Sequence, residues 1–229
     1  MTVGFEVHNA NNKLQVTDRF YNIRLVARKA IMLNTDFTEI STGEDELIAF
    51  RALNNTNTPV ALWSVSKDTA VFKKTGSSTV MLVYYRFKHT DIPAGDCFEV
   101  RNASDEVVFS DNARFMKIIN SINGVWDGRS NYTTETIIPA GVTAAVLHGA
   151  RYRESISTVF GDGGWGSIVS FNYFGQQFIF NGDRIKTVYA NEYKWEYGSP
   201  VPAPDSPVIS TYKIVPYNFL VLDVSLLDA

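Results

Sequence analysis

The residues that could bind a metal ion are few and widely spaced in this chain. Its histidines are His8, His89 and His148, and Cys97 is its single cysteine. A structural zinc site needs four such ligands, usually with pairs only a few residues apart. No such pair occurs here, so the sequence predicts no metal site and no cofactor. A single thiol also excludes an internal disulfide framework.

The glycine cluster at 161–166 is the segment most similar to a nucleophile or nucleotide motif. Around Trp165 and Ser167 it lacks the Gly-x-Ser-x-Gly spacing of a nucleophile elbow. It also lacks the Lys-Ser/Thr pair that completes a phosphate-binding loop. We interpret the cluster as a flexible loop between strands. Contact of Trp165 with a ligand or partner is the alternative.

Paired carboxylates are the last enzymatic option. A glycosidase needs two carboxyl groups about 5–10 Å apart. Asp162, Asp183, Glu192 and Glu196 lie in the aromatic-rich second half, but nothing in their spacing requires them to meet. The sequence therefore predicts no catalytic residues and no enzyme, and a glycan-degrading enzyme is kept as a third hypothesis.

Aromatic residues crowd the region 170–200. Tyr193, Trp195 and Tyr197 alternate with charged residues, so they would share one face of a strand. That face is either part of the core or an exposed platform, because flat rings with polar edges suit both sugars and protein interfaces. We take these three residues and Trp165 as candidate contact residues.

Composition and charge describe a globular protein. The 229 residues are 45% hydrophobic and 20% charged, with a net charge of −3, which argues against nucleic acid as the main partner. The longest apolar run is about six residues, whereas a membrane-spanning helix needs about 20, so no membrane insertion is expected. No secretory signal is recognisable at the N-terminus, and we expect synthesis and folding in a reducing cytoplasm.

The pattern of apolar residues predicts an all-β protein. Short runs rich in Val, Ile, Thr, Phe and Tyr are separated by Asn, Asp, Gly or Pro, which is typical of a β-sandwich. The predicted strands are 3–8, 13–17, 20–27, 46–53, 60–65, 78–87, 97–101, 107–110, 143–148, 167–173, 177–180, 184–190 and 217–226. Only Phe115, Ile118, Ile119 and Ile122 have helical spacing.

An internal repeat relates the two halves. Residues 5–18 align without gaps to residues 98–111, and six of the 14 positions are identical. Each copy alternates apolar and polar residues, then has an Asn-Ala turn and a second strand, so the sequence predicts one hairpin used twice. A chance similarity of turns is the alternative. The repeat favours a strand over a helix after Phe115.

Four of the eight prolines lie between positions 200 and 207, where they favour an extended spacer. The apolar strand that follows, with Phe219, Leu220 and Leu222, either closes its own sheet or pairs with a neighbouring subunit. We expect the second, and therefore take these three residues as candidate interface residues. The predicted organisation is two related β-sandwich-like modules, 1–90 and 91–198, and an extended C-terminal arm, 199–229.

The opening hairpin carries a resemblance to a known family. Residues 4–10, Gly-Phe-Glu-Val-His-Asn-Ala, followed by a hairpin and an Arg-Phe pair, resemble small virion proteins of tailed bacteriophages. The copy at 98–115 is more similar still, and residues 219–224 resemble the hydrophobic-Asp-Val ending of that family. Asn12 and Asp105 stand near the family's usual turn glycine. The resemblance implies an all-β structural protein of the tail or neck, with no catalytic residues.

The resulting hypothesis is a structural component of a phage virion, made in the host cytoplasm. Its expected partners are other tail or neck proteins and further copies of itself, with a host surface glycan as a further candidate. The alternative hypothesis is a carbohydrate- or receptor-binding β-module at the tail tip. Exposed rings at Trp165 and Trp195 would favour binding, and buried rings would favour a scaffold.

Overall fold

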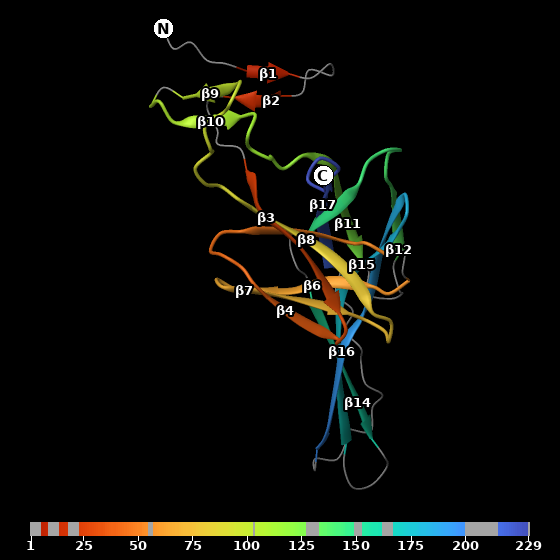
Figure 1. Cartoon of the computed structure of the whole chain (residues 1–229). Coiled ribbons are helices and arrows are strands. Elements are labelled where there is room, and N and C mark those ends of the chain that lie inside the picture. The colour runs from red at the N-terminus through yellow and green to blue at the C-terminus, as the bar shows by residue number, and fades with distance from the viewer. Residues whose placement is uncertain are drawn as a thin grey trace.

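The computed structural model describes residues 6–8, 14–17, 23–54, 57–102, 104–126, 133–148, 153–161, 167–199 and 215–228. In 6–8, 14–17, 153–161, 167–174, 189–199 and 215–216, and at residue 126, it describes the backbone alone. The described residues form β-strands and no helix, so the all-β prediction is confirmed (Figure 1). The strands are β1 Glu6–His8, β2 Leu14–Thr17, β3 Arg24–Leu33, β4 Phe37–Ser41, β5 Leu47–Ala52, β6 Val60–Val65, β7 Thr69–Lys74, β8 Val80–Lys88, β9 Glu99–Arg101, β10 Val107–Ser110, β11 Ile118–Trp126, β12 Thr133–Ile137, β13 Ala144–His148, β14 Arg153–Gly161, β15 Ser167–Asn181, β16 Arg184–Ser199 and β17 Val215–Asp223.

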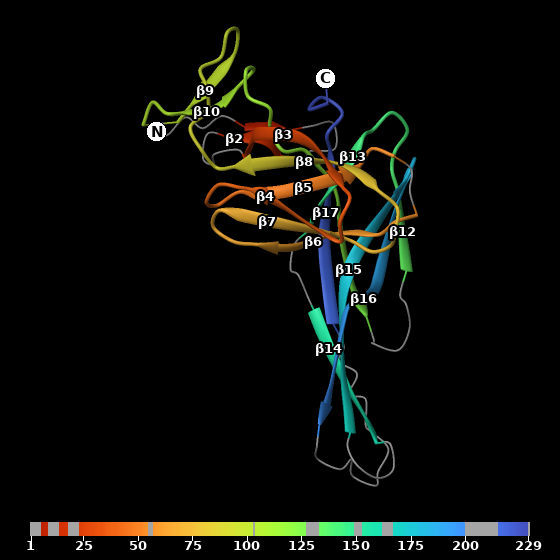
Figure 2. The same ribbon diagram turned by 60° about the horizontal axis from the view of Figure 1, so that its bottom comes forward.

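Two large antiparallel sheets pack against each other as a β-sandwich (Figure 2). Within the described residues, the first sheet has the order β11-β17-β13-β5-β8-β3. The second has the order β12-β16-β15-β6-β7-β4, and β14 is added beside β15. The helical alternative for the segment after Phe115 is wrong, because β11 is an edge strand of the first sheet.

Both sheets have a palindromic strand order. From one edge, the first sheet contains β3, β8 and β5 and the second sheet contains β4, β7 and β6, all from the first half of the chain. From the other edge, the first sheet contains β11, β17 and β13 and the second sheet contains β12, β16 and β15, which are the corresponding strands of the second half. The halves meet where Phe50 of β5 faces Val146 of β13, and where Val60 of β6 faces Phe178 of β15. The chain is thus a duplicated half-sandwich whose halves share two continuous sheets.

The core between the sheets is built by both halves. The fully buried ring of Phe50 contacts Phe72, Phe178 and Phe180 edge to face, at centroid distances of 5.4, 5.9 and 6.0 Å. Phe178 in turn meets Phe219 at 5.0 Å. Burying each such side chain contributes about 1.5–3 kcal/mol, so this shared aromatic cluster holds the two halves together.

The two small hairpins, β1–β2 and β9–β10, have the same backbone pairing. Val7 faces Val16 in the first hairpin, and Val100 faces Phe109 at the corresponding positions of the second. A one-residue register shift follows at the same place in both. The predicted repeat is therefore confirmed at the level of hairpin pairing.

The loop of the second hairpin explains two features of the shared sequence. Oδ1 of Asn102, the counterpart of Asn9, accepts hydrogen bonds of 2.9 and 3.0 Å from two backbone N–H groups of the loop. Asp105 has a φ of 65°, in the left-handed region that Gly, Asn and Asp tolerate. An aspartate thus adopts a backbone conformation that glycine would otherwise favour.

The base of this hairpin is closed by Asp111, the counterpart of Asp18. Its carboxylate accepts two backbone hydrogen bonds of 3.0 Å, from Asp96 and Cys97. Gly95 lies against the same group, and a Cβ there would be 2.3 Å from the carbonyl oxygen of Phe98. This close approach requires glycine.

The C-terminal strand differs from the sequence-based expectation. β17 lies between β11 and β13, with Phe219 facing both Ile122 and His148. Phe219 and Leu222 are 1% and 0% exposed. The expectation that this strand is an extended arm contacting a neighbour is wrong, because its apolar side chains complete the packing of its own sheet.

Beyond β17, a C-terminal turn folds back over the outer face of the first sheet. Leu227 is buried there against an apolar cluster that includes Tyr85. The next residue, Asp228, accepts hydrogen bonds from Tyr85 Oη at 2.6 Å and Arg28 Nε at 2.9 Å, and pairs with Arg51. These contacts fasten the end of the second half to three strands of the first.

Candidate functional site

A long extension of the second sheet projects from the sandwich (Figures 1 and 2). It consists of residues 153–161, 167–175 and 190–199, which pair as a three-stranded antiparallel ribbon, and we call it the strand extension. Nine residues of a strand span about 30 Å. The corresponding strands of the first half, β6 and β7, have only six residues each, so the extension breaks the symmetry of the duplicated scaffold.

Three candidate contact residues lie on the strand extension. Tyr193 of β16 faces Tyr173 of β15, Trp195 faces Phe171, and Tyr197 is two residues further along the same strand. Alternate residues of a strand belong to one face. The pairing therefore places aromatic residues of both strands at neighbouring positions on one face of the extension.

The remaining candidates that the structure describes are buried or partly buried. Trp165 lies outside the described residues. Phe219 and Leu222 are core residues, and Leu220 is partly buried against the cluster on the outer face of the first sheet. The assignment of Phe219 and Leu222 to an interface is therefore corrected, because their side chains are taken up by the chain's own packing.

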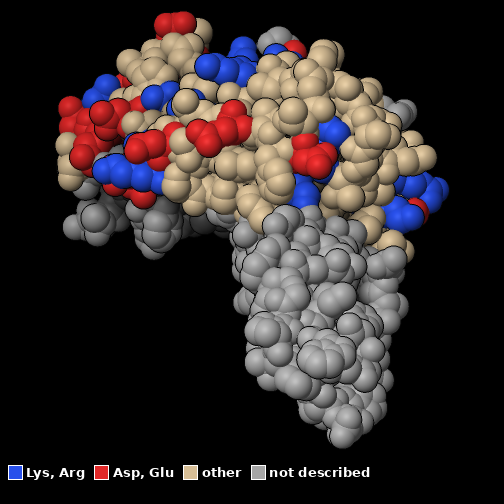
Figure 3. All heavy atoms as spheres, turned by 90° about the horizontal axis from the view of Figure 1, so that it is seen from below, with Lys and Arg blue, Asp and Glu red and all other residues tan. Residues whose placement is uncertain are grey.

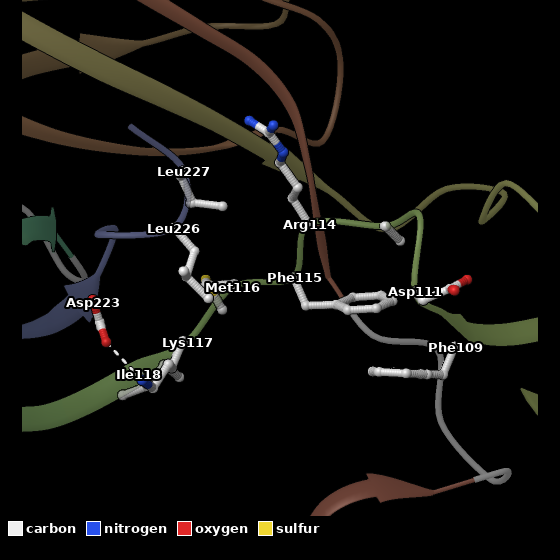
Figure 4. A pocket seen from close by; sticks show the side chains of 11 residues that line it. Phe109, Asp111, Arg114, Phe115, Met116, Lys117, Ile118, Asp223, Leu226 and Leu227 are labelled. Carbon is white, nitrogen blue, oxygen red and sulfur yellow. Dashed lines mark hydrogen bonds and ion pairs between the residues drawn. The ribbon is translucent and has the colours of Figure 1, made fainter. Parts of the chain in front are cut away.

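A groove of about 610 Å³ lies at the opposite end of the molecule, between the second hairpin and the C-terminal turn (Figure 4). The rings of Phe109 and Phe115 stack on one side, with centroids 4.8 Å apart. Leu226 lines the other side and is 79% exposed, and Ile118 is 50% exposed. Exposed apolar residues of this size around a groove are typical of a protein contact surface.

Two charged side chains at the edge of this groove form an ion pair. Lys117 Nζ lies 2.6 Å from a carboxylate oxygen of Asp223 (Figure 4). Burial alone would raise the pKa of Asp223, but hydrogen bonds from Lys117 and Ser225 outweigh it and lower the pKa below its usual value. The carboxylate is therefore committed to a structural ion pair and is poorly suited to accept a proton in catalysis.

The sequence reasoning did not identify an aromatic cluster on the outer face of the second sheet. Phe37 of β4 and Trp63 of β6 meet edge to face at 5.4 Å. The ammonium of Lys73, on β7 between them, lies 5.1 and 5.0 Å from the two ring centroids. The three residues come from three strands, so no local pattern in the sequence predicts their contact.

Other site chemistries have little support in the described part of the chain. Its His, Cys, Asp and Glu residues form no group of three that could hold a metal ion. None of its segments is a helix long and apolar enough to cross a membrane. On the face seen in Figure 3, basic and acidic side chains are mixed, whereas nucleic-acid binding requires a continuous basic surface.

Comparisons of the chain with protein-family models, with curated proteins and with solved structures give no match. Three outer surfaces of the duplicated β-sandwich are candidates for contact with a partner or ligand: the strand extension, the groove at the second hairpin and the aromatic cluster around Trp63.

Proposed function

We propose that this chain is a structural component of a bacteriophage virion, in the tail or neck, and that it acts by assembling with other virion proteins and with further copies of itself. The observation that supports this most is the strand extension. The first half of the sandwich forms without such an extension. An added element that projects about 30 Å is available for contact with a partner.

The aromatic residues of the extension suit such a contact. Tyr and Trp are enriched at the centres of protein interfaces, where they contribute more binding energy than other residues. Tyr193, Trp195 and Tyr197 share one face, and Lys194 and Glu196 occupy the other. We place the partner on the aromatic face.

The second hairpin supports the same function. It carries the motif that resembles phage virion proteins, and its base borders the groove with exposed Leu226 and Ile118. An apolar groove beside a closed ion pair fits a partner polypeptide better than a reacting substrate.

The test is a set of substitutions in the phage gene. Tyr193→Ala, Trp195→Ala and Tyr197→Ala are combined in one variant, and Lys194→Ala and Glu196→Ala, on the other face of the same strand, form the matched control. We expect the aromatic variant to fold but to lower incorporation into particles by at least about tenfold, because interface aromatics dominate binding. Incorporation of both folded variants at the wild-type level would contradict the proposal.

A further inference from the structure

The aromatic cluster of the second sheet is built around a β-bulge. The pairing of β6 with β7 shifts by one residue between Leu62 and Ser64, so Trp63 is an extra residue in its strand. Bulges re-aim side chains and recur next to functional sites. Here the bulge brings Trp63 into contact with Phe37 on the edge strand β4.

Lys73 holds the two rings in place. Its ammonium lies 5.1 Å from the centroid of Phe37 and 5.0 Å from that of Trp63, within the range of cation–π attraction. Lys73 is only 6% exposed, whereas Phe37 is 43% exposed. The rings thus cover the cation while the ring of Phe37 remains accessible, and a ligand that stacks on Phe37 would not have to order it first.

Polar groups without partners lie beside the rings. Glu39 is exposed and shares the outer face of β4 with Phe37, two residues away. No hydrogen bond or ion pair within the described residues engages its carboxylate. Ser64, next to Trp63 in the bulge, faces Val71, which in turn faces Glu39. A preformed aromatic surface therefore has both a free acceptor and a hydroxyl at its edge.

The second half of the chain shows that the fold does not require this arrangement. β12 has the place of β4 in the palindromic order and the same alternation of exposed and buried residues. Thr133 and Glu135 stand there in place of Phe37 and Glu39, and the Glu135 carboxylate is paired with Arg184 at 3.0 Å. The equivalent face thus forms with a threonine and an ion pair, without rings or a free carboxylate.

We infer that the outer face of β4, β6 and β7 binds a saccharide, with a pyranose ring stacked on the exposed ring of Phe37, which Trp63 orients by its edge-to-face contact, and with sugar hydroxyls hydrogen-bonded to Glu39 and Ser64. Aromatic faces with a few placed polar groups are the usual composition of a small-molecule site. The sugar is uncharged, because the Glu39 carboxylate would repel an acidic sugar while the rings cover Lys73. This site is independent of the virion role and of the strand extension.

The experiment titrates the full chain with neutral oligosaccharides of glucose, galactose, mannose and N-acetylglucosamine and, for comparison, with acidic oligosaccharides of glucuronic acid. Binding is measured by saturation-transfer NMR and calorimetry. We expect at least one to bind with a Kd of about 10 mM or tighter. Trp63→Ala and Phe37→Ala should each weaken binding at least about tenfold, and Glu39→Gln about three- to tenfold. The matched controls at the equivalent face, Glu135→Gln and Ile137→Ala, should bind as the unaltered chain does.

The outcomes separate binding from stability. Removing a ring exposes Lys73 and is expected to lower stability, so thermal unfolding is measured for every variant. The Glu39→Gln variant leaves the ring contacts intact. If the ring variants unfold, its effect on saccharide binding therefore tests the site on its own. Three results would overturn the inference: no binding of any neutral saccharide, tighter binding of acidic sugars than of neutral ones, or binding that Glu39→Gln leaves unchanged.

Discussion

The hydroxyl of Tyr85 donates a 2.6 Å hydrogen bond to the carboxylate of Asp228, although 143 positions separate the two residues. Tyr85 belongs to β8 of the first half, and Asp228 follows β17 of the second. Arg28 and Arg51 pair with the same carboxylate. The end of the chain is therefore fastened across both halves, and the stability of one half depends on the other.

Replacing Asp228 by Asn should destabilise the fold by about 1–3 kcal/mol near neutral pH, because three donors lose a charged acceptor. The control is Asp183→Asn, since the Asp183 side chain is 72% exposed and should contribute little. Urea unfolding of both variants gives the comparison. Equal stability of the two variants would show that the C-terminal contact is dispensable.

The same carboxylate should make the protein sensitive to acid. Burial alone would raise the pKa of Asp228, but hydrogen bonds from Tyr85, Arg28 and Arg51 outweigh it and lower the pKa in the folded protein. The stabilisation is then present above the usual carboxyl pKa of about 3.9 and is lost as the pH falls through the lowered value. As the pH is lowered from about 5 through this pKa, the Asp228→Asn variant should therefore lose less free energy of unfolding than the unaltered chain. Urea unfolding at a series of pH values measures the difference.

Tyr85 should make the protein sensitive to alkali. Burial raises its pKa to about 12, and the hydrogen bond to Asp228 adds to this effect. The neutral phenol therefore stabilises the fold fully below pH 10, and this contribution, roughly 2–3 kcal/mol, is lost between about pH 10 and 12. The difference in unfolding free energy between the unaltered chain and Tyr85→Phe should shrink over that range, and a constant difference would contradict the assignment.

Gly124 should not tolerate a side chain. It faces Tyr217 across β11 and β17, and a Cβ at this position would lie 2.2 Å from the buried Tyr217 ring. Gly124→Ala should therefore cost about 1–3 kcal/mol, as overpacking does. Its cost should fall when it is combined with Tyr217→Ala in a double-mutant cycle. Additive effects in chemical denaturation would show that the ring moves aside freely.

Deleting residues 215–229 should unfold the protein. β17 pairs with strands on both sides, and its removal would leave β11 without its neighbour in the first sheet and expose the core around Phe178. We expect insoluble protein, or a soluble chain without a cooperative thermal transition in circular dichroism. A folded, soluble monomer would instead mean that this strand is an exchangeable arm.

The strands that the sequence predicted best are short runs of apolar residues. The predicted ranges 60–65 and 107–110 coincide with β6 and β10. The edge strands β4 and β12 were not predicted, because each buries a single residue, Ile40 or Thr136, and is otherwise polar or exposed. Edge strands have less apolar area to bury and therefore a weaker signal.

The candidate sites were predicted less well than the fold. The alternation of aromatic and charged residues predicted that Tyr193, Trp195 and Tyr197 lie on a strand. It could not predict that this strand pairs with β15, because a local pattern does not specify the neighbouring strand. The cluster of Phe37, Trp63 and Lys73 depends on a bulge, which breaks the very alternation that reveals strands. The position of β17 was missed for a related reason, since an apolar strand carries no local signal for which sheet it joins.

Quantitative mass spectrometry of purified virions tests most directly whether this chain is a virion component. Particles from infected cells that express the chain are separated from unassembled protein on a density gradient and washed in high salt. We predict a constant number of copies per particle from one preparation to the next, at a fixed ratio to the other tail or neck proteins. A chain that is abundant in the infected cells but absent from the washed particles would contradict the proposed role.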